Sequence, residues 1–188
     1  MQVMVVKKMR DDRAALGVFI DLQGRLHDQM PQRVVLDKKL DMLARGLSAL
    51  NVPLGVSEQM PEKLGVTSEL LKSQLTEASY IRKSTFSCCG APAFRALLSQ
   101  LDSHIIILAG IEAHICVYQT ALDLLAGGRE VWVAADATAS RDSEYRDYAF
   151  EMLRAKGAVV MPVESILLDL LGDAADSRFK KILPLLKG

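Results

Sequence analysis

The segment 104–128, HIIILAGIEAHICVYQTALDLLAGG, decides the fold class of this chain. Residues 104–110 are almost continuously apolar and rich in β-branched side chains, which predicts a strand that is buried on both faces. Over 114–126 the pattern changes to the spacing of one helix face, with apolar residues at Ile115, Tyr118, Leu122 and Leu125. The glycine pair at 127–128 ends the predicted helix. A strand that passes directly into a helix is typical of parallel α/β folds.

The same alternation of strand-like and helix-like segments runs along the rest of the chain. Further strand-like runs occupy 14–21, 52–57, 130–136 and 158–163, with a weaker one at 79–83. Helix-like segments occupy 31–50, 91–101, 143–156, 165–171 and 178–186. The polar segment 58–69 lacks a periodic pattern, and we expect it to be irregular. These patterns predict one α/β domain over 1–188, a three-layer αβα fold with an open sheet of about six parallel strands in the Rossmann-like order 3-2-1-4-5-6.

Composition limits the partners of the protein. The 188 residues are 50% hydrophobic and 24% charged, and 23 basic and 23 acidic residues give a formal net charge of zero. The longest apolar run, 104–117, is too short and too polar to span a bilayer. A cluster of basic residues without acidic neighbours occurs near the C-terminus, at Arg178, Lys180, Lys181 and Lys187. So few charges are more typical of a solvated face than of a nucleic-acid site. We therefore predict no membrane span and no nucleic-acid partner.

Three cysteines, Cys88, Cys89 and Cys116, are too few for a disulfide framework in a chain of this length, which favours a reducing compartment. The basic N-terminus, MQVMVVKKMR, has a short apolar run and no small-residue cleavage site, so we expect a cytoplasmic protein, with organellar import left open. No CxxC pair occurs, and the three histidines are scattered at His27, His104 and His114. The usual zinc spacings are therefore missing, and the sequence predicts neither a metal nor another cofactor.

Chemically active side chains follow several of the predicted strands. In an open parallel sheet, ligands bind beyond the carboxyl ends of the strands, and right-handed crossovers place all of these ends on one rim. The candidates on this rim are Asp21, Glu58, Gln59, Lys83, Glu112 to Cys116 and Asp136. We therefore expect a carboxylate, an amine and a thiol to meet there.

Cys116 is the candidate nucleophile of this rim. It lies in the first turn of the predicted helix, where free N–H groups and the helix dipole favour a thiolate, so we expect a lowered pKa. On position alone an inert buried cysteine is the more frequent case, and a strand-end aspartate such as Asp21 often caps a turn. Together with Lys83, the set supplies a nucleophile, a general base and a stabilising cation. His114 is two positions before Cys116, so a Cys-His dyad is not expected on a helix.

The sequence around these three positions resembles the isochorismatase-like hydrolases, which include nicotinamidases and N-carbamoyl amidohydrolases. The resemblance covers roughly 14–163 and rests on GVFIDLQGRL around Asp21, RKSTFSCCG around Lys83, and ILAGIEAHICVYQTALDLLAGGREVWVAADATASR around Cys116. It implies that these three residues form a catalytic triad. It also implies a cis peptide between Ile111 and Glu112, and an oxyanion hole formed by the backbone N–H groups of Glu112 and Cys116.

Four residues near this rim are candidates for binding the substrate: Gln23, Gln59, Phe86 and Ile111. For Phe86, an anchor that holds its loop to the core is an equal alternative. Differences between this sequence and two branches of the family narrow the range of expected activities. True isochorismatases lack the cysteine that this chain has at Cys116, and the segment SEQMPEKLG at 57–65 stands where nicotinamidases have an Asp-x-His metal set. That segment resembles the isochorismatase domain-containing branch, whose substrates are largely unassigned.

The resulting hypothesis is a cysteine-dependent hydrolase that cleaves a C–N bond of a small amide or ureido substrate through an acyl-enzyme on Cys116. The resemblance further implies a homo-oligomer, either a dimer or a larger assembly. Two alternatives stay open. One is a non-enzymatic oligomeric scaffold of the same fold, and the other is a redox-responsive thiol protein in which Cys88 or Cys89 resolves an oxidised Cys116.

Overall fold

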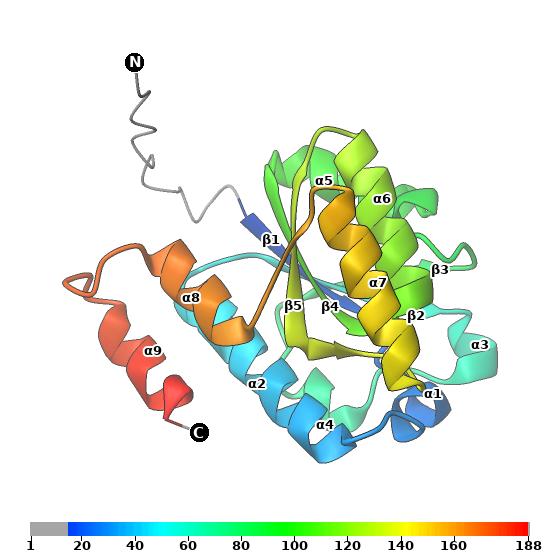
Figure 1. The fold of residues 1–188 in the computed structure, drawn as a ribbon, viewed down its shortest axis with the longest axis horizontal. Helices are drawn as coiled ribbons and strands as arrows, with labels where there is room; N and C mark the ends of the chain where they lie inside the picture. The colour runs from blue at the N-terminus through cyan, green and yellow to red at the C-terminus, as the bar shows by residue number, and fades with distance from the viewer. Residues whose placement is uncertain (1–14, 188) are drawn as a thin grey trace.

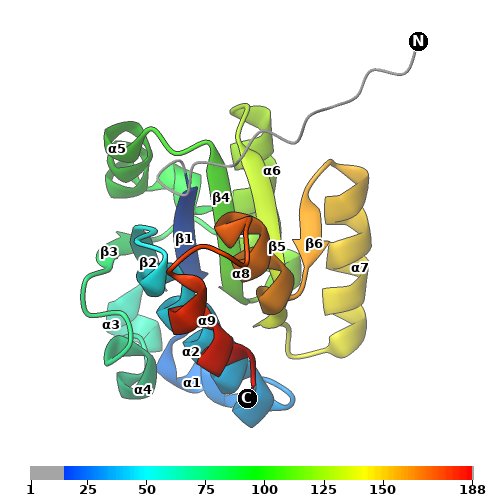
Figure 2. The ribbon, with the colours of Figure 1, turned by 90° about the vertical axis from the view of Figure 1, so that its left-hand side faces the viewer.

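The computed structural model describes residues 15–187, and its centre is a sheet of six parallel strands. The strands are β1 (Ala15–Ile20), β2 (Leu54–Gln59), β3 (Ser79–Lys83), β4 (Ile105–Ile111), β5 (Glu130–Ala139) and β6 (Val159–Met161). Figure 2 shows them in the order β3-β2-β1-β4-β5-β6, which confirms the predicted topology. The N-terminal segment MQVMVVKKMR, on which the expectation about import rests, lies outside the described residues.

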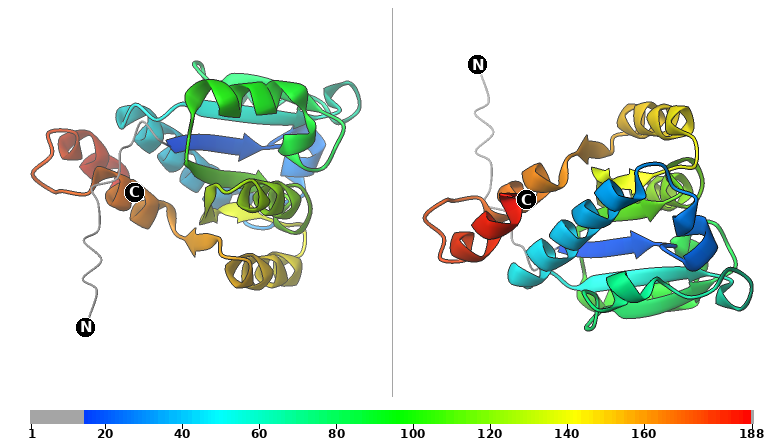
Figure 3. Two further views of the ribbon diagram at one scale, coloured as in Figure 1. Left: turned by 90° about the horizontal axis from the view of Figure 1, so that it is seen from above. Right: turned by 90° about the horizontal axis from the view of Figure 1, so that it is seen from below.

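Helices cover both faces of this sheet, as continuously apolar strands require. One face carries α2 (Arg33–Ala49), α8 (Val163–Leu171) and α9 (Phe179–Leu186), and the other carries α5 (Pro92–Leu101), α6 (Tyr118–Ala126) and α7 (Ser143–Ala155) (Figure 1). Along β4, Ile105 and Ile107 enter the core on the α2 side, whereas Ile106 and Leu108 enter the core on the α6 side. At the end of the chain α9 lies alongside α2 (Figure 3). None of the helices within 15–187 is long and apolar enough to cross a membrane.

The segment 58–69 is more ordered than its sequence predicts. Glu58 and Gln59 complete β2, and the short helices α3 (Pro61–Leu64) and α4 (Glu69–Lys72) follow. The buried carboxylate of Glu58 holds this segment, because its Oε1 accepts hydrogen bonds from the backbone N–H (2.8 Å) and the hydroxyl (2.9 Å) of Thr67. Helices of four residues are too short to show a repeating apolar face. The same holds for α1 (Gly24–Asp28), which the sequence pattern also missed.

The direction of crossover reverses between β1 and β4, which are neighbours at the centre of the sheet. After β1 the chain crosses by α2 on one face, and after β4 it crosses by α6 on the other, so the turns that follow these two strands face each other. Gly110 permits the close approach there. Its φ is +120°, and a Cβ at this position would lie 2.2 Å from the carbonyl oxygen of Ile20. The topology therefore brings the residues after β1 and β4 together.

Candidate active site

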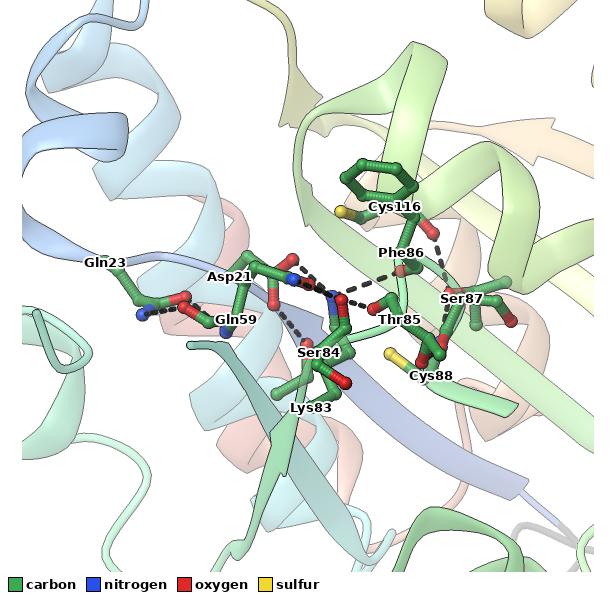
Figure 4. A network of polar contacts seen from close by, with 12 residues as sticks. Asp21, Gln23, Gln59, Lys83, Ser84, Thr85, Phe86, Ser87, Cys88 and Cys116 are labelled. Atoms are coloured by element: carbon green, nitrogen blue, oxygen red, sulfur yellow. Dashed lines mark hydrogen bonds and ion pairs between the residues drawn. The ribbon is translucent and has the colours of Figure 1, made fainter. Parts of the chain in front are cut away.

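Asp21, Lys83 and Cys116, the three predicted catalytic residues, meet at the carboxyl ends of β1, β3 and β4 (Figure 4). Cys116 belongs to a π-helical turn, η3 (Ala113–Val117), between β4 and α6. Lys83 Nζ donates to Asp21 Oδ2 at 2.7 Å, and the two side chains are 0% and 2% exposed. The thiol of Cys116 lies near the same carboxylate, which raises the pKa of the thiol. One buried carboxylate thus acts on both an ammonium and a thiol.

The ammonium group of Lys83 is surrounded by acceptors. Besides Asp21, it donates to Gln59 Oε1 at 2.7 Å and to the backbone carbonyls of Phe86 at 3.1 Å and Thr85 at 3.4 Å. The loop after β3 therefore wraps around the ammonium group and fixes it against the carboxylate.

The other oxygen of Asp21 is held by a residue that the sequence analysis missed. Asp21 leaves the strand with φ +52°, a left-handed conformation that aspartate adopts more readily than most residues. The buried Ser57 Oγ donates to Asp21 Oδ1 at 2.7 Å. The strand register explains this contact, because Ser57 pairs with Ile20 across β1 and β2. A signal was present, since a serine in a strand buried on both faces needs a hydrogen-bond partner.

Burial raises the pKa of the Cys116 thiol from 9.0 to about 12, the Asp21 carboxylate adds to the rise, and Lys83 opposes it. The prediction of a lowered pKa is therefore wrong. The helix-dipole argument left out desolvation, which disfavours a thiolate in a buried site. In addition, the turn at Cys116 is π-helical instead of the start of a regular α-helix. The resting thiol is protonated, so its activation requires a base, and the nearby Asp21 carboxylate is placed to accept its proton.

The backbone around the nucleophile is fixed by several contacts. The peptide between Ile111 and Glu112 is cis, as the family resemblance implies. The carbonyl of Glu112 accepts a hydrogen bond from the N–H of Val117 at 3.2 Å, which closes the π turn. The Glu112 carboxylate accepts a hydrogen bond from the backbone N–H of Arg141 at 3.0 Å, at the end of β5. The N–H groups of Glu112 and Cys116, which are predicted to bind an oxyanion, belong to this fixed turn.

Thr120 joins the turn at Cys116 to the loop after β3, and it too was missed from the sequence. Its buried Oγ1 donates to the carbonyl of Cys116 at 2.6 Å and accepts from the N–H of Cys88 at 3.0 Å. Thr120 follows Cys116 by four residues, the spacing at which a helical threonine reaches a carbonyl one turn back. The spacing was therefore a usable signal.

The four predicted substrate residues fall into two pairs. Gln59 contacts the buried ammonium group described above, and Phe86 is 54% exposed on the loop after β3. Gln23 is fully buried, and its side-chain amide bonds with the backbone N–H (2.6 Å) and carbonyl (3.1 Å) of Gln59 and with the carbonyl of Gly65. Ile111 is part of the core at the end of β4. Gln59 and the backbone of Phe86 thus contact Lys83 of the triad, whereas Gln23 bonds with neighbouring backbone and Ile111 is part of the core.

Two residues of the predicted rim contact other parts of the fold. Asp136 lies inside β5, so the prediction that it follows the strand is wrong, because the strand continues past the apolar run. Its carboxylate accepts from the N–H of Val163 at 2.8 Å and pairs with Lys39 at 3.3 Å. The Nδ1 of His114 lies 2.9 Å from the Oγ of Ser140, the residue that follows β5, in agreement with the expectation that His114 forms no dyad with the cysteine.

The other two cysteines, Cys88 and Cys89, are free thiols. Burial raises the pKa of Cys88, and it raises the pKa of Cys89 to about 11. All three thiols are therefore protonated at neutral pH. Among residues 15–187, no group of three or more His, Cys, Asp or Glu side chains is arranged to bind a metal ion.

Comparison with known proteins identifies the family of the chain. The model of the isochorismatase domain matches residues 15–165. Isochorismatase domain-containing protein 1 of Salmo salar is 39% identical over 146 residues, 77% of this chain and 51% of that protein, so the chain spans about half the length of this relative.

Two solved structures extend the comparison to the fold. The structure of the MAR1 ribonuclease from Caenorhabditis elegans is 32% identical, with a TM-score of 0.85 over 96% of this chain and 93% of that one. The Escherichia coli YcaC gene product, described as an octameric hydrolase of unknown specificity, is 20% identical, with a TM-score of 0.88 over 95% and 89% of the two chains, and this likeness shows the fold alone. Sequence and structure agree over most of the chain, and it belongs to the isochorismatase family.

Proposed function

We propose that this protein is a cysteine hydrolase that cleaves a C–N bond of a small amide or ureido compound. The observation that carries the proposal is the position of Asp21, whose buried carboxylate lies 2.7 Å from the ammonium of Lys83 and close enough to the thiol of Cys116 to raise its pKa. A thiol with a pKa of about 12 is a poor nucleophile at neutral pH unless a base removes its proton. Membership of the isochorismatase family supports hydrolysis as the class of reaction.

The first half-reaction forms an acyl-enzyme. Asp21 accepts the thiol proton while Cys116 Sγ attacks the carbonyl carbon of the substrate. The tetrahedral intermediate then collapses, the C–N bond breaks, and the proton on Asp21 passes to the leaving nitrogen. A thioester to Cys116 remains, and the amine departs.

The second half-reaction returns the enzyme to its resting form. Asp21 accepts a proton from water while the water oxygen attacks the thioester carbon. The C–S bond breaks, and the proton on Asp21 returns to the sulfur of Cys116. The product is a carboxylic acid, or a carbamate when the substrate is a ureido compound.

Charge stabilisation comes from two sources in this mechanism. Lys83 balances the negative charge that moves between Asp21 and Cys116, at the 2.7 Å distance seen in the resting site. The backbone N–H groups of Glu112 and Cys116 bind the developing oxyanion, and the hydrogen bonds that fix the turn support this role. No cofactor takes part in these steps.

The surroundings of the thiol favour a small substrate. Cys116 is only 7% exposed, so a bulky group cannot reach its sulfur without movement of the surrounding loops. The exposed ring of Phe86 is the proposed cover over one side of the substrate. Assembly into a homo-oligomer, which the octameric description of the Escherichia coli YcaC protein supports, and a cytoplasmic location are part of the same proposal.

Mass spectrometry of a covalent intermediate tests the proposal. The protein is incubated with a panel of small primary amides and ureido acids, quenched in acid, and examined by intact mass and peptide mapping. We expect an acyl adduct on Cys116 with at least one substrate class. Cys116→Ala should abolish the adduct and turnover, and Cys89→Ala, which removes a half-buried thiol with no role in the proposed hydrolysis, should retain both.

The same experiment separates the alternatives. A sulfenic acid or a disulfide at Cys116 without any acyl adduct would favour a redox-responsive thiol protein. An unmodified thiol with every substrate, in a protein that assembles normally, would favour the scaffold. Because the Caenorhabditis elegans relative is described as a ribonuclease, RNA is included in the panel, and RNA cleavage that survives Cys116→Ala would contradict the cysteine mechanism.

A further inference from the structure

Three buried side chains, those of Ser57, Cys88 and Thr120, form a layer next to the triad. Ser57 on β2 contacts the Asp21 carboxylate, and Thr120 on α6 contacts the carbonyl of Cys116. Cys88 is also buried, and its backbone N–H donates to Thr120 Oγ1 at 3.0 Å. All three residues of this layer are shielded from solvent. The serine therefore holds the base, and the threonine holds the backbone of the nucleophile.

Ser57 controls the orientation of the base. With Oδ1 held by Ser57 at 2.7 Å and Oδ2 held by Lys83 at 2.7 Å, the carboxylate of Asp21 cannot rotate away from the thiol without losing a hydrogen bond. A hydrogen bond to a carboxylate also favours its ionised form over its protonated form. Loss of the serine hydroxyl should therefore make the base easier to protonate.

Thr120 acts on the nucleophile instead of the base. Its hydroxyl holds the carbonyl of Cys116 at 2.6 Å, and the same oxygen accepts the N–H of Cys88 at 3.0 Å. The turn that carries the sulfur is thereby tied to the loop that wraps the ammonium group. Loss of this hydroxyl should displace the sulfur without changing the protonation of the carboxylate.

We propose that Ser57 and Thr120 are positioning residues, Ser57 acting through Asp21 and Thr120 acting through Cys116. The inference rests on the proposed function, because it assumes that Asp21 takes the proton of the Cys116 thiol. The two residues have different signatures: the serine sets the pH at which the thiol becomes active, and the threonine sets how fast the active thiol reacts.

The test follows alkylation of Cys116 by iodoacetamide across the acid-to-neutral pH range, with peptide mapping to assign the label. This readout requires no substrate. We expect Ser57→Ala to move the acid midpoint of the rate profile upward by about one pH unit, which is about tenfold in rate on the acid limb. We expect Thr120→Val to lower the rate about tenfold at every pH with the midpoint unchanged, and Thr120→Ser, which keeps the hydroxyl, to restore the rate.

Matched controls come from two other buried hydroxyl groups. Ser103 and Thr138 are both buried, and within residues 15–187 their side-chain oxygens have no hydrogen-bond partner. Ser103→Ala and Thr138→Val therefore remove the same atoms as the test variants without removing a contact to the triad. Both controls should alkylate like the wild type.

The outcomes separate this inference from the proposed function. If Asp21→Asn leaves alkylation at neutral pH unchanged, Asp21 is not the base and the proposed function fails. If Asp21→Asn abolishes alkylation while Ser57→Ala keeps the wild-type midpoint, or Thr120→Val reacts at the wild-type rate, the positioning roles are overturned. Should Thr120→Val fail to fold, as judged by fluorescence of the buried Trp132, the Ser57 midpoint and the Thr120→Ser rate decide the question.

Discussion

Replacing Lys83 with methionine should strongly destabilise the protein, because the change leaves a buried charge without its partner. The Nζ of Lys83 lies 2.7 Å from Asp21 Oδ2, and the side chains are 0% and 2% exposed, so water cannot take the place of the ammonium group. The same group also satisfies Gln59 Oε1 and two backbone carbonyls. Removing one partner of a buried ion pair costs about 3–5 kcal/mol, and we expect Lys83→Met to fall in this range.

Urea unfolding, followed through the fluorescence of the single tryptophan Trp132, measures this cost. The double variant Lys83→Met/Asp21→Asn removes the unpaired charge and should recover about 2 kcal/mol or more of the loss in a double-mutant cycle. Lys72→Met is the matched control. Lys72 pairs with Glu69 at 2.9 Å on the surface, where the side chains are 31% and 86% exposed, and we expect no measurable change in stability.

Two results would refute this reasoning. One is a loss for Lys83→Met as small as the loss for Lys72→Met, which would show that solvent reaches the pair. The other is a double variant whose loss equals the sum of the two single losses, which would show that the two charges are not coupled. If the pair is buried and coupled, neither of these two results should be observed.

Chelation, alkaline pH and double substitution provide three more tests of the site. Activity should survive EDTA, because no metal-binding group of side chains occurs among residues 15–187, and a loss that zinc or manganese restores would contradict this. The pKa of Cys116 is about 12 in the fold and 9.0 in its ordinary state, so the unfolded chain loses this proton first and stability should fall as pH rises from 9.0 toward about 12. The slope from this group is about 1.4 kcal/mol per pH unit, and urea midpoints of Cys116→Ala should decline less steeply than those of the wild type. In single-turnover acylation, the double variant of Asp21→Asn and Cys116→Ala should match the worse single variant, whereas additive losses would mean that another residue activates the thiol.

The part of the site that lies at strand ends could be predicted from the sequence, because all strands of a parallel sheet end on one edge. Asp21 ends an apolar run, Lys83 ends the weaker strand-like segment at 79–83, and Cys116 follows the run at 104–110, so locating the strands was enough to bring the three together. The cis peptide after Ile111 came from the family motif, since no rule of composition or spacing contains it.

The remaining features depend on relations between neighbouring elements, which a single stretch of sequence does not contain. Ser57 reaches Asp21 because the register of β1 and β2 sets it opposite Ile20. The pKa of Cys116 rises because the packed chain excludes water from its thiol, whereas the sequence revealed only its place at a helix start. The short helix α3 depends on the turn after β2 and has no periodic pattern of its own.

Gly110 sets the distance between β1 and β4 near the active site. Because a Cβ there would lie 2.2 Å from the carbonyl oxygen of Ile20, the separation of β1 and β4 is set by bare backbone. Any larger residue would push the two strands apart at their carboxyl ends. There β1 leads to Asp21, the proton acceptor, and β4 leads to Cys116, which carries the sulfur. Variants at this position should therefore lose soluble yield and thiol alkylation together, so genetic damage to the reaction can arise at a residue that has no functional group at all.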